Sequence, residues 1–257
     1  MNDELSPDTQ AIALLTAPLL LRPAARIAPE PPPLTVAEYG QLALCLRGLG
    51  RTPADLLADR ELLERCDHVV PRERVRRLLD RGFLLAQALE RWAGRAIWLM
   101  SRADGDYPPN LKAHLGNAAP PLVYGCGDRT LVARGGLALA PGCRWQADTL
   151  ARVARLIAEA GAALVTPTPV GSLDCHVIAA VPGHLERAAL SPLHRAALIA
   201  HRLVIVSSCD PLAAPDSAAH AVAPLIAALA DATIDDVPSD ASVLATLLAT
   251  ARAARSR

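Results

Sequence analysis

Apolar residues in the first third of the chain recur at the spacing of short helices. Thr35 and Glu38 form a capping-box pattern at the start of a helix that is expected to end near Gly48. Two further short helices follow, the second opening at Pro71, because proline fits the first turn of a helix. Residues 34–95 are therefore predicted to form a small all-helical domain.

Beyond residue 96 the pattern changes to short apolar runs that alternate with helical periods. Each run is bounded by turn residues and is rich in aliphatic side chains, as the strands of a buried parallel sheet are. The predicted fold class is therefore α/β, with a parallel sheet in residues 96–257 preceded by the small helical domain. The predicted strands are 97–101, 122–124, 137–140, 163–166, 177–181, 203–207 and 233–237, and helices are expected near 145–160, 187–200, 217–230 and 240–254.

The start of the chain, residues 1–33, is predicted to be a separate helical segment and connector. Its apolar run from Ala11 to Leu21 is interrupted by Pro18 and lacks the basic flank of a signal peptide. Residues 22–33 are rich in proline, so they can form neither a continuous helix nor a central strand. Since no uninterrupted apolar run approaches the roughly 18 residues of a membrane helix, we expect a cytoplasmic protein without a membrane partner.

Composition limits the functions that the chain can have. Hydrophobic residues make up 52% of the chain and aromatic residues 3%, so Leu, Ala and Val must fill the core. Lysine plus arginine and aspartate plus glutamate number 26 each, which excludes the global positive field of a strongly basic nucleic-acid binder. Any DNA site must be a local patch, and nearly every cation that could form it is a guanidinium.

The sequence lacks the common catalytic, metal and cofactor motifs. Its six cysteines contain no Cys-x-x-Cys pair, so neither a metal site nor a disulfide framework is expected. Walker A, HExxH and Gly-x-Ser-x-Gly motifs are absent, and no cofactor is predicted. Ser207, Ser208 and Cys209 follow a predicted strand and could form a nucleophile cluster with Asp210 and His220. The prediction is nevertheless a binding protein that is not an enzyme.

One long stretch, residues 81–128, has a distinctive order of elements. A helix leads into a strand, followed by Asp104-Gly105-Asp106-Tyr107-Pro108-Pro109, a short helix and a Pro-Pro-Leu-Val-Tyr strand that ends in a Gly-rich turn. This order resembles the approach to the Rossmann-like domain of DprA/Smf-type DNA-processing proteins. Further blocks resemble one branch of that family in collinear order: SPDTQAIALLTAPLL at 6–20, LTVAEYGQLALCLRGLGRTPADLLA at 34–58, HLERAAL at 184–190, LHRAAL at 193–198, RLVIVSSCDPLA at 202–213 and LIAALADATI at 225–234.

The resemblance implies a fold and a function. The fold is a Rossmann-like domain preceded by a small helical domain. The function is to bind incoming or damaged single-stranded DNA, as in natural transformation, to protect it and to hand it to a recombinase. The expected partners are single-stranded DNA bound with weak to moderate affinity, a RecA-type recombinase, and a second subunit in a homo- or hetero-dimer.

The family follows the first strand of its Rossmann-like domain with a Gly-Ser-Arg turn. Small residues there let the backbone approach a phosphate, and the arginine contacts it. This chain has Gly142-Cys143-Arg144 at that position. Gly142 and Arg144 match the pattern, whereas Cys143 replaces the serine and removes a hydroxyl donor. The resemblance implies a phosphate-binding turn, and an ordinary strand-to-helix turn is the alternative.

A second family element is present only in part. The family has a Gly-rich loop that runs into Arg-Gly-Ile-Asp and a helix; here Gly171 stands at the arginine position, followed by Ser172 and Asp174, of which Asp174 matches. Val177 already begins the next strand, so most of the helix is missing. Two prolines in this loop remove backbone donors that a phosphate site uses. A basic Arg-Asn-Lys-type segment is also absent, because residues 220–224 are His-Ala-Val-Ala-Pro.

Three other features admit a binding role and a structural one. His194 and Arg195 match the family and could line the groove at the carboxyl ends of the strands, or they could belong to a solvated helix face. The arginines of Arg72–Arg81 form either a second DNA-contacting surface or a solvated face, since acidic residues lie among them. The glycines of the 48–50 turn either present N–H groups to a phosphate or cap a helix.

Two other functions stay open. In the first, the chain is a structural or regulatory partner of an intact DprA-like protein and does not bind DNA, which the prolines between residues 166 and 174 favour. In the second, it senses or hydrolyses a nucleotide, because related Rossmann-like folds bind nucleotides in the same cleft. That function predicts a small-molecule pocket with convergent polar groups beside Gly142.

Overall fold

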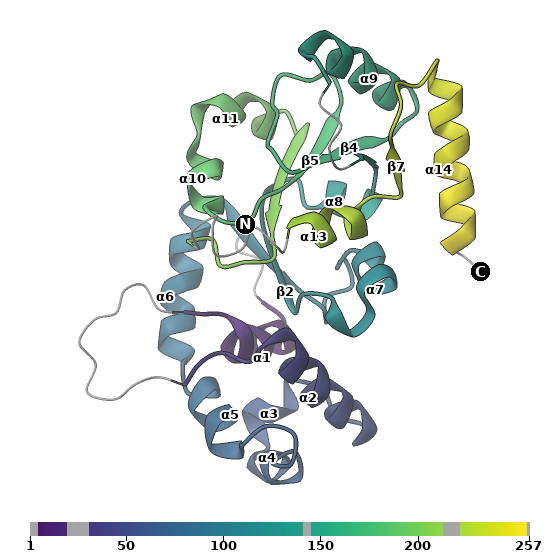
Figure 1. The fold of residues 1–257 in the computed structure, drawn as a ribbon. Helices are drawn as coiled ribbons and strands as arrows, with labels where there is room; N and C mark the ends of the chain where they lie inside the picture. Colours follow the sequence, from purple (N-terminus) through teal and green to yellow (C-terminus); the bar gives the residue numbers. More distant parts are fainter. Residues whose placement is uncertain (1–4, 20–30, 141–144, 213–221, 256–257) are drawn as a thin grey trace. The chain divides into compact units, whose positions relative to one another are not determined.

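The computed structural model describes residues 5–19, 31–140, 145–212 and 222–255 (Figure 1). The chain divides into two compact units, which are described separately below. The helical unit comprises residues 1–94, 99–107 and 117–123, and the sheet unit comprises residues 95–98, 108–116 and 124–257.

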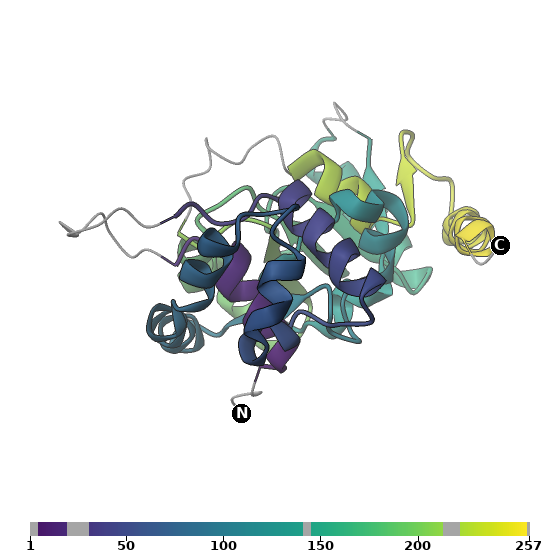
Figure 2. The same cartoon turned by 90° about the horizontal axis from the view of Figure 1, so that it is seen from below.

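The helical unit is built around α1 (Pro7–Thr16), which packs against three other helices. Ile12, Leu14 and Leu15 of α1 are at most 2% exposed, so this short helix is the centre of the core (Figure 2, purple). The capping box at Thr35 is confirmed, since its hydroxyl accepts from the Glu38 N–H. The other helices are α2 (Val36–Gly48), α3 (Asp55–Ala58), α4 (Arg60–Arg65), α5 (Arg72–Leu79) and α6 (Gly82–Ala93).

The predicted α/β fold class is confirmed by a seven-stranded, mostly parallel sheet with strand order β1-β2-β6-β5-β4-β3-β7. Strands β3, β4, β5 and β7 are parallel to their neighbours, and β6 is parallel to β5. The central strands β4, β5 and β6 are almost wholly buried, which explains their continuous apolar runs. The strands are β1 (Ile97–Ser101), β2 (Leu122–Gly127), β3 (Leu137–Leu139), β4 (Ala163–Thr166), β5 (His176–Ala180), β6 (Leu203–Ser207) and β7 (Ala232–Ile234).

Strand β2 corrects the expectation of a wholly parallel sheet. It runs antiparallel to β6, with Tyr124 opposite Ser207 and Gly127 opposite Val204. The direction of a strand is not encoded in a buried apolar run, so the pattern of residues 122–127 could not predict it. The Trp98 indole lies against the backbone of Gly125. A Cβ at position 125 would be 2.2 Å from the ring, so a residue with a side chain does not fit there.

The helices of the sheet unit lie close to the predicted ranges, with one correction. The single helix expected at 187–200 is two helices, since Pro192 cannot continue a helix and instead opens a new one after Ser191. The first residues of the helix expected at 217–230 lie outside the described part of the chain. The helices are α7 (Pro109–Leu115), the 3₁₀ turn η1 (Gly116–Ala118), α8 (Thr130–Arg134), α9 (Ala147–Glu159), α10 (Leu185–Leu190), α11 (Pro192–Ile199), α13 (Val222–Leu229) and α14 (Ala241–Arg255).

The connection between β4 and β5 contains no helix. Residues 167–175 join these two parallel neighbours directly, although a parallel crossover ordinarily needs a dozen or more residues and a helix. The predicted loss of the helix after the 166–174 loop is thereby confirmed. Within the described residues, no helix has both the length and the apolar character needed to cross a bilayer.

Candidate nucleic-acid interface

The order of the strands defines where a ligand site is expected. From β3 the chain proceeds through β4, β5 and β6 on one side, and β7 then returns to the other side of β3. Open α/β sheets bind ligands at the carboxyl ends of the strands where the order reverses, which here are β3 and β7. Gly142, Cys143 and Arg144 follow β3 in the sequence, at this reversal, and lie outside the described residues.

The helix that follows this turn, α9, begins without a side-chain cap. Its N-cap residue is Gln146, whose side chain accepts no hydrogen bond from the first turn. The N–H groups at the start of a helix need acceptors, and phosphates are among the acceptors that such positions bind. Asp148 lies exposed in the same turn and adds a negative charge that competes with an anion. The start of α9 therefore has uncapped N–H groups that suit an anion, with one opposing negative charge beside them.

The described residues that directly follow the parallel strands have little positive charge. Asp210 follows β6, and Asp235 and Asp236 follow β7, whereas the described residues directly after β4 and β5 have His184 as their basic side chain. Arg144 is the arginine that the sequence places after β3.

Gly171 lies against α11. A Cβ at this position would be 3.0 Å from the carbonyl oxygen of Leu193, 3.3 Å from the Ala197 Cβ and 3.8 Å from the His194 Cα. The structure thus brings together two of the predicted site residues, Gly171 and His194. Atoms of α11 also occupy the space into which a longer side chain at position 171 would extend.

The other predicted residues of this loop are exposed. Ser172 and Asp174 face solvent on either side of the buried Leu173, and Arg202 donates to the Leu173 carbonyl oxygen at 2.9 Å. The backbone of the loop is therefore held by Arg202. Ser172 is free to donate to a phosphate, whereas the Asp174 carboxylate would repel one.

The two family matches on α11 differ in availability. His194 is half-buried, and its Nδ1 donates to the Ala188 carbonyl oxygen at 3.0 Å, which ties α11 to α10. Arg195 is exposed and makes no ion pair with any residue in the described part of the chain. Leu193 next to it is 84% exposed. Arg195 can therefore contact an external phosphate, whereas His194 is engaged in the hydrogen bond that joins α11 to α10.

The possible nucleophile cluster after β6 has no activated group among the described residues. Ser207 is fully buried and its hydroxyl accepts from the Cys209 N–H at 3.1 Å. Burial raises the pKa of the Cys209 thiol, and hydrogen bonds with Ser208 and Ser207 offset only part of this effect. A protonated thiol is a weak nucleophile. His220, the predicted base, lies outside the described residues.

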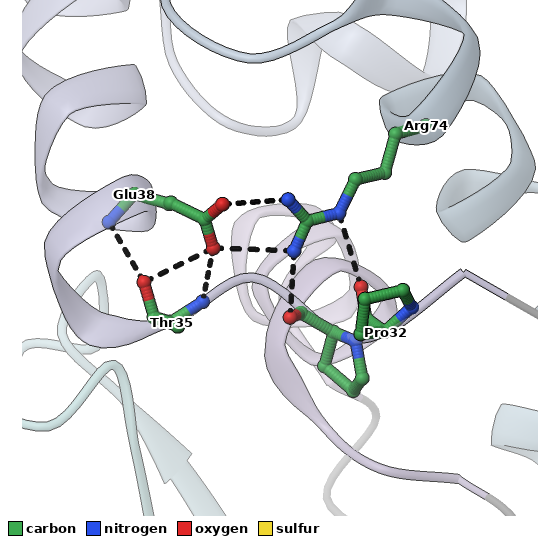
Figure 3. A network of polar contacts seen from close by, with 5 residues as sticks. Pro32, Thr35, Glu38 and Arg74 are labelled. Atoms are coloured by element: carbon green, nitrogen blue, oxygen red, sulfur yellow. Dashed lines mark hydrogen bonds and ion pairs between the residues drawn. The ribbon is translucent and has the colours of Figure 1, made fainter.

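The arginines of Arg72–Arg81 do not form one continuous basic face, because α5 ends at Leu79. Arg74 donates to both carboxylate oxygens of Glu38, at 2.6 and 3.1 Å, and to two proline carbonyls of the connector (Figure 3). Arg81 is 5% exposed and donates to the Leu14 and Ala17 carbonyl oxygens at the end of α1. These two arginines are therefore bonded within the helical unit. Arg72, Arg76 and Arg77 are exposed, as the alternative of a solvated face predicts.

The glycine turn after α2 serves as a helix cap. Gly50 has a φ of +68°, and the N–H groups of Leu49, Gly50 and Arg51 donate to carbonyls of the last turn of α2. These donors are therefore already used within the chain, as in a helix C-cap.

The Asp104–Tyr107 motif also has a structural role. Asp104 Oδ1 accepts from the Thr9 hydroxyl at 2.6 Å, and its Oδ2 accepts from the Ser101 N–H at 2.7 Å. The Tyr107 hydroxyl donates to the Pro120 carbonyl oxygen at 2.8 Å. Thr9 and Ser101 are fully buried, so this motif satisfies polar groups between α1 and the end of β1.

Comparison with known proteins gives weak structural likenesses, and two of them are to DNA processing proteins. No protein-family model and no curated protein matches the chain. DNA processing protein A (DprA) from Streptococcus pneumoniae is similar over 87% of this chain and 85% of its own, with a TM-score of 0.47 and 14% identity. DNA processing protein A from Helicobacter pylori, studied for its single-stranded DNA binding mode, is similar over 61% of this chain and 77% of its own, with a TM-score of 0.41 and 19% identity.

Proposed function

We propose that this chain binds single-stranded DNA through its phosphate backbone, as a DprA-like DNA-processing protein. The observation that carries the proposal is the position of Gly142–Arg144 in the strand order. This segment links β3, where the order reverses, to the N-terminus of α9, which lacks a side-chain cap. The collinear sequence blocks that resemble DprA-like proteins support the same function.

Each residue of the proposed site has a separate part in binding. Gly142 lacks a side chain and lets the phosphate approach the backbone, while the N–H groups at the start of α9 donate to its oxygens. The Arg144 guanidinium supplies the positive charge and can donate two hydrogen bonds to one phosphate. Arg195 adds a second, exposed cation. Transfer of the strand to a RecA-type recombinase and dimer formation belong to the same proposal, by family resemblance.

The proposal predicts a weak dependence of affinity on salt. With formal charge balanced at 26 cations and 26 anions, only one or two phosphates are neutralised, by Arg144 and Arg195. For single strands the slope of log K against log salt is about −0.7 per phosphate, so we expect a slope between about −0.7 and −1.4.

A salt-series anisotropy assay on labelled oligothymidylate tests this function. Arg144→Ala should weaken binding several-fold and make the slope shallower by about 0.7, because one phosphate contact is lost. Arg152→Ala is the matched control, since Arg152 is exposed farther along α9 and its removal changes net charge equally. Equal loss in both variants would show that binding responds to net charge alone. Absence of binding in the native chain at low salt would end the proposal.

A second function, as a structural or regulatory partner without DNA binding, is favoured by one observation. The described residues directly after β6 and β7 include Asp210, Asp235 and Asp236, which repel a polyanion. If this function is correct, the native chain fails to bind the oligonucleotide even at low salt. Replacing the three aspartates by asparagine then creates measurable affinity, because the repulsion is removed.

A further inference from the structure

Two cysteines of the helical unit place their sulfur atoms in contact. Cys45 lies in the last turn of α2, and Cys66 caps the end of α4. Their Sγ atoms are 3.4 Å apart, the one sulfur–sulfur contact among the cysteines that the structure describes. Cys45 is half-buried and Cys66 is 2% exposed. A small reagent can thus reach Cys45, and the sulfur of the buried Cys66 is in contact with the Cys45 sulfur.

We propose that Cys45 and Cys66 form a redox-active dithiol site, which hydrogen peroxide converts to an intramolecular disulfide. A disulfide has a sulfur–sulfur bond of about 2.05 Å, so the two atoms must approach by little more than 1 Å. Rotation about the two Cα–Cβ bonds can supply a movement of this size without separating α2 from α4. Among the other described cysteines, Cys126 and Cys175 are buried and make no such contact.

The reaction proceeds in two balanced steps. The Cys45 thiolate attacks one peroxide oxygen, forming an S–O bond as the O–O bond breaks and hydroxide leaves to become water. The Cys66 sulfur then attacks the sulfenic sulfur of Cys45, forming the S–S bond as the S–O bond breaks, and the thiol proton leaves with the hydroxide as a second water. Two thiols lose two electrons, and one peroxide is reduced to two waters.

The surroundings of the pair determine the order of attack. Burial, followed by the hydrogen bond with Cys45, raises the pKa of Cys66 to about 11. Cys66 therefore stays protonated and shielded while the more exposed Cys45 meets the oxidant. Because the second sulfur lies at 3.4 Å, ring closure outpaces further oxidation of the sulfenic acid.

The disulfide would join the ends of α2 and α4. It closes the loop of residues 45–66, which includes the glycine cap of α2 and the whole of α3. A cross-link of this kind restricts the unfolded chain, so oxidation should stabilise the helical unit. A dithiol reductant should reverse the change, since Cys45 gives access to the bond.

Peptide mapping of the full-length protein tests the proposal directly. The chain is treated with hydrogen peroxide, alkylated and digested with trypsin without reduction. The expected product links the peptide 27–47 to the peptide 66–72, and dithiothreitol separates them. Cys209→Ser, which removes another half-buried thiol, should leave the linked product unchanged. The proposal is wrong if Cys45 is instead recovered as a sulfinic or sulfonic acid, as a disulfide to another cysteine, or as an alkylated thiol after the peroxide is consumed.

Thermal unfolding provides a second, independent readout. The oxidised native chain should melt several degrees above the reduced chain, and dithiothreitol should abolish the difference. Cys45→Ser and Cys66→Ala should each melt at one temperature whether or not peroxide is added. A lower melting temperature on oxidation, or an increase that persists in either variant, would overturn the proposal that this pair closes without strain.

Discussion

Replacing Glu38 by glutamine removes the negative charge of the Glu38–Arg74 ion pair in the helical unit. The Glu38 carboxylate accepts from Arg74, from the Thr35 N–H at 2.8 Å and from the Thr35 hydroxyl at 3.0 Å (Figure 3). The Arg74 hydrogen bond, followed by that of the Thr35 backbone, lowers the pKa of Glu38 from 4.5 to about 2. Arg74 also holds the Pro32 carbonyl oxygen at 3.1 Å. The charge therefore joins α2, α5 and the connector.

The size of the effect follows from the pKa. A difference of about 2.5 pKa units corresponds to an upper bound of about 3 kcal/mol, at 1.36 kcal/mol per unit. The Glu38 side chain is 32% exposed and that of Arg74 is 21% exposed, so solvent screens part of this energy. We expect Glu38→Gln to cost about 1 to 2 kcal/mol at pH 7, a factor of about 5 to 30 in the unfolding equilibrium.

The pH dependence has a defined sign. Since the pKa of Glu38 is lower in the folded than in the unfolded chain, its stabilisation is fully present above about pH 4.5. It is lost as the pH falls toward 2, where the folded state also takes up the proton. The difference between native chain and variant should therefore be constant from pH 7 to pH 5 and should vanish near pH 2.

Hydrogen exchange of α2 peptides measures this difference in a urea series. Native chain and variant are compared at the same pH, so their intrinsic exchange rates cancel. Glu73→Gln is the matched control, because Glu73 also lies in the first turn of a helix and pairs with an arginine, but this pair is exposed on both sides. The control should not change the protection of α2. Equal effects of the two variants, or a Glu38→Gln effect that persists at pH 2, would refute the reasoning.

Three further substitutions test other contacts. Arg81→Met should destabilise the helical unit by about 3 kcal/mol, because it leaves carbonyls at the end of α1 without a donor; a urea midpoint equal to that of the native chain would contradict this role. Arg252→Ala removes two hydrogen bonds from the buried Asp231 carboxylate, so we expect a cost of about 2 kcal/mol and faster hydrogen exchange of α14, with unchanged exchange as the contrary result. Gly171→Arg should lower the melting temperature without increasing affinity for single-stranded DNA, because the new side chain meets the backbone of α11; tighter binding at an unchanged melting temperature would show that the space is open.

The central strands could be located from the sequence because they are almost wholly buried. Strand β6 spans Leu203–Ser207 and β4 spans Ala163–Thr166, as predicted, since each is an aliphatic run with turn residues beside it. The final strand was predicted to extend to residue 237, but β7 ends at Ile234, before two aspartates. Those aspartates were a signal that the prediction did not use, because aspartate is depleted in strands.

The break between α10 and α11 also had a local signal. Pro192 lacks an N–H group and fits the first turn of a helix, so Ser191-Pro192 marks a new helix start. By contrast, the burial of Arg81 had none. It arises because α5 ends two residues earlier, which turns the side chain toward the carbonyls that end α1, and a contact across more than 60 residues is not encoded in local spacing.

The candidate site shows the same division between local and long-range information. The interval between Thr166 and Val177 is too short for a strand-to-strand helix, and the sequence alone revealed that loss. Its consequence appears only in the fold: the short loop brings Gly171 against the backbone of α11. The position at which DprA-like proteins have an arginine is therefore closed by packing as well as changed in residue type. The proposed phosphate binding would then depend on Arg144, which follows in the sequence the strand at which the order of the sheet reverses.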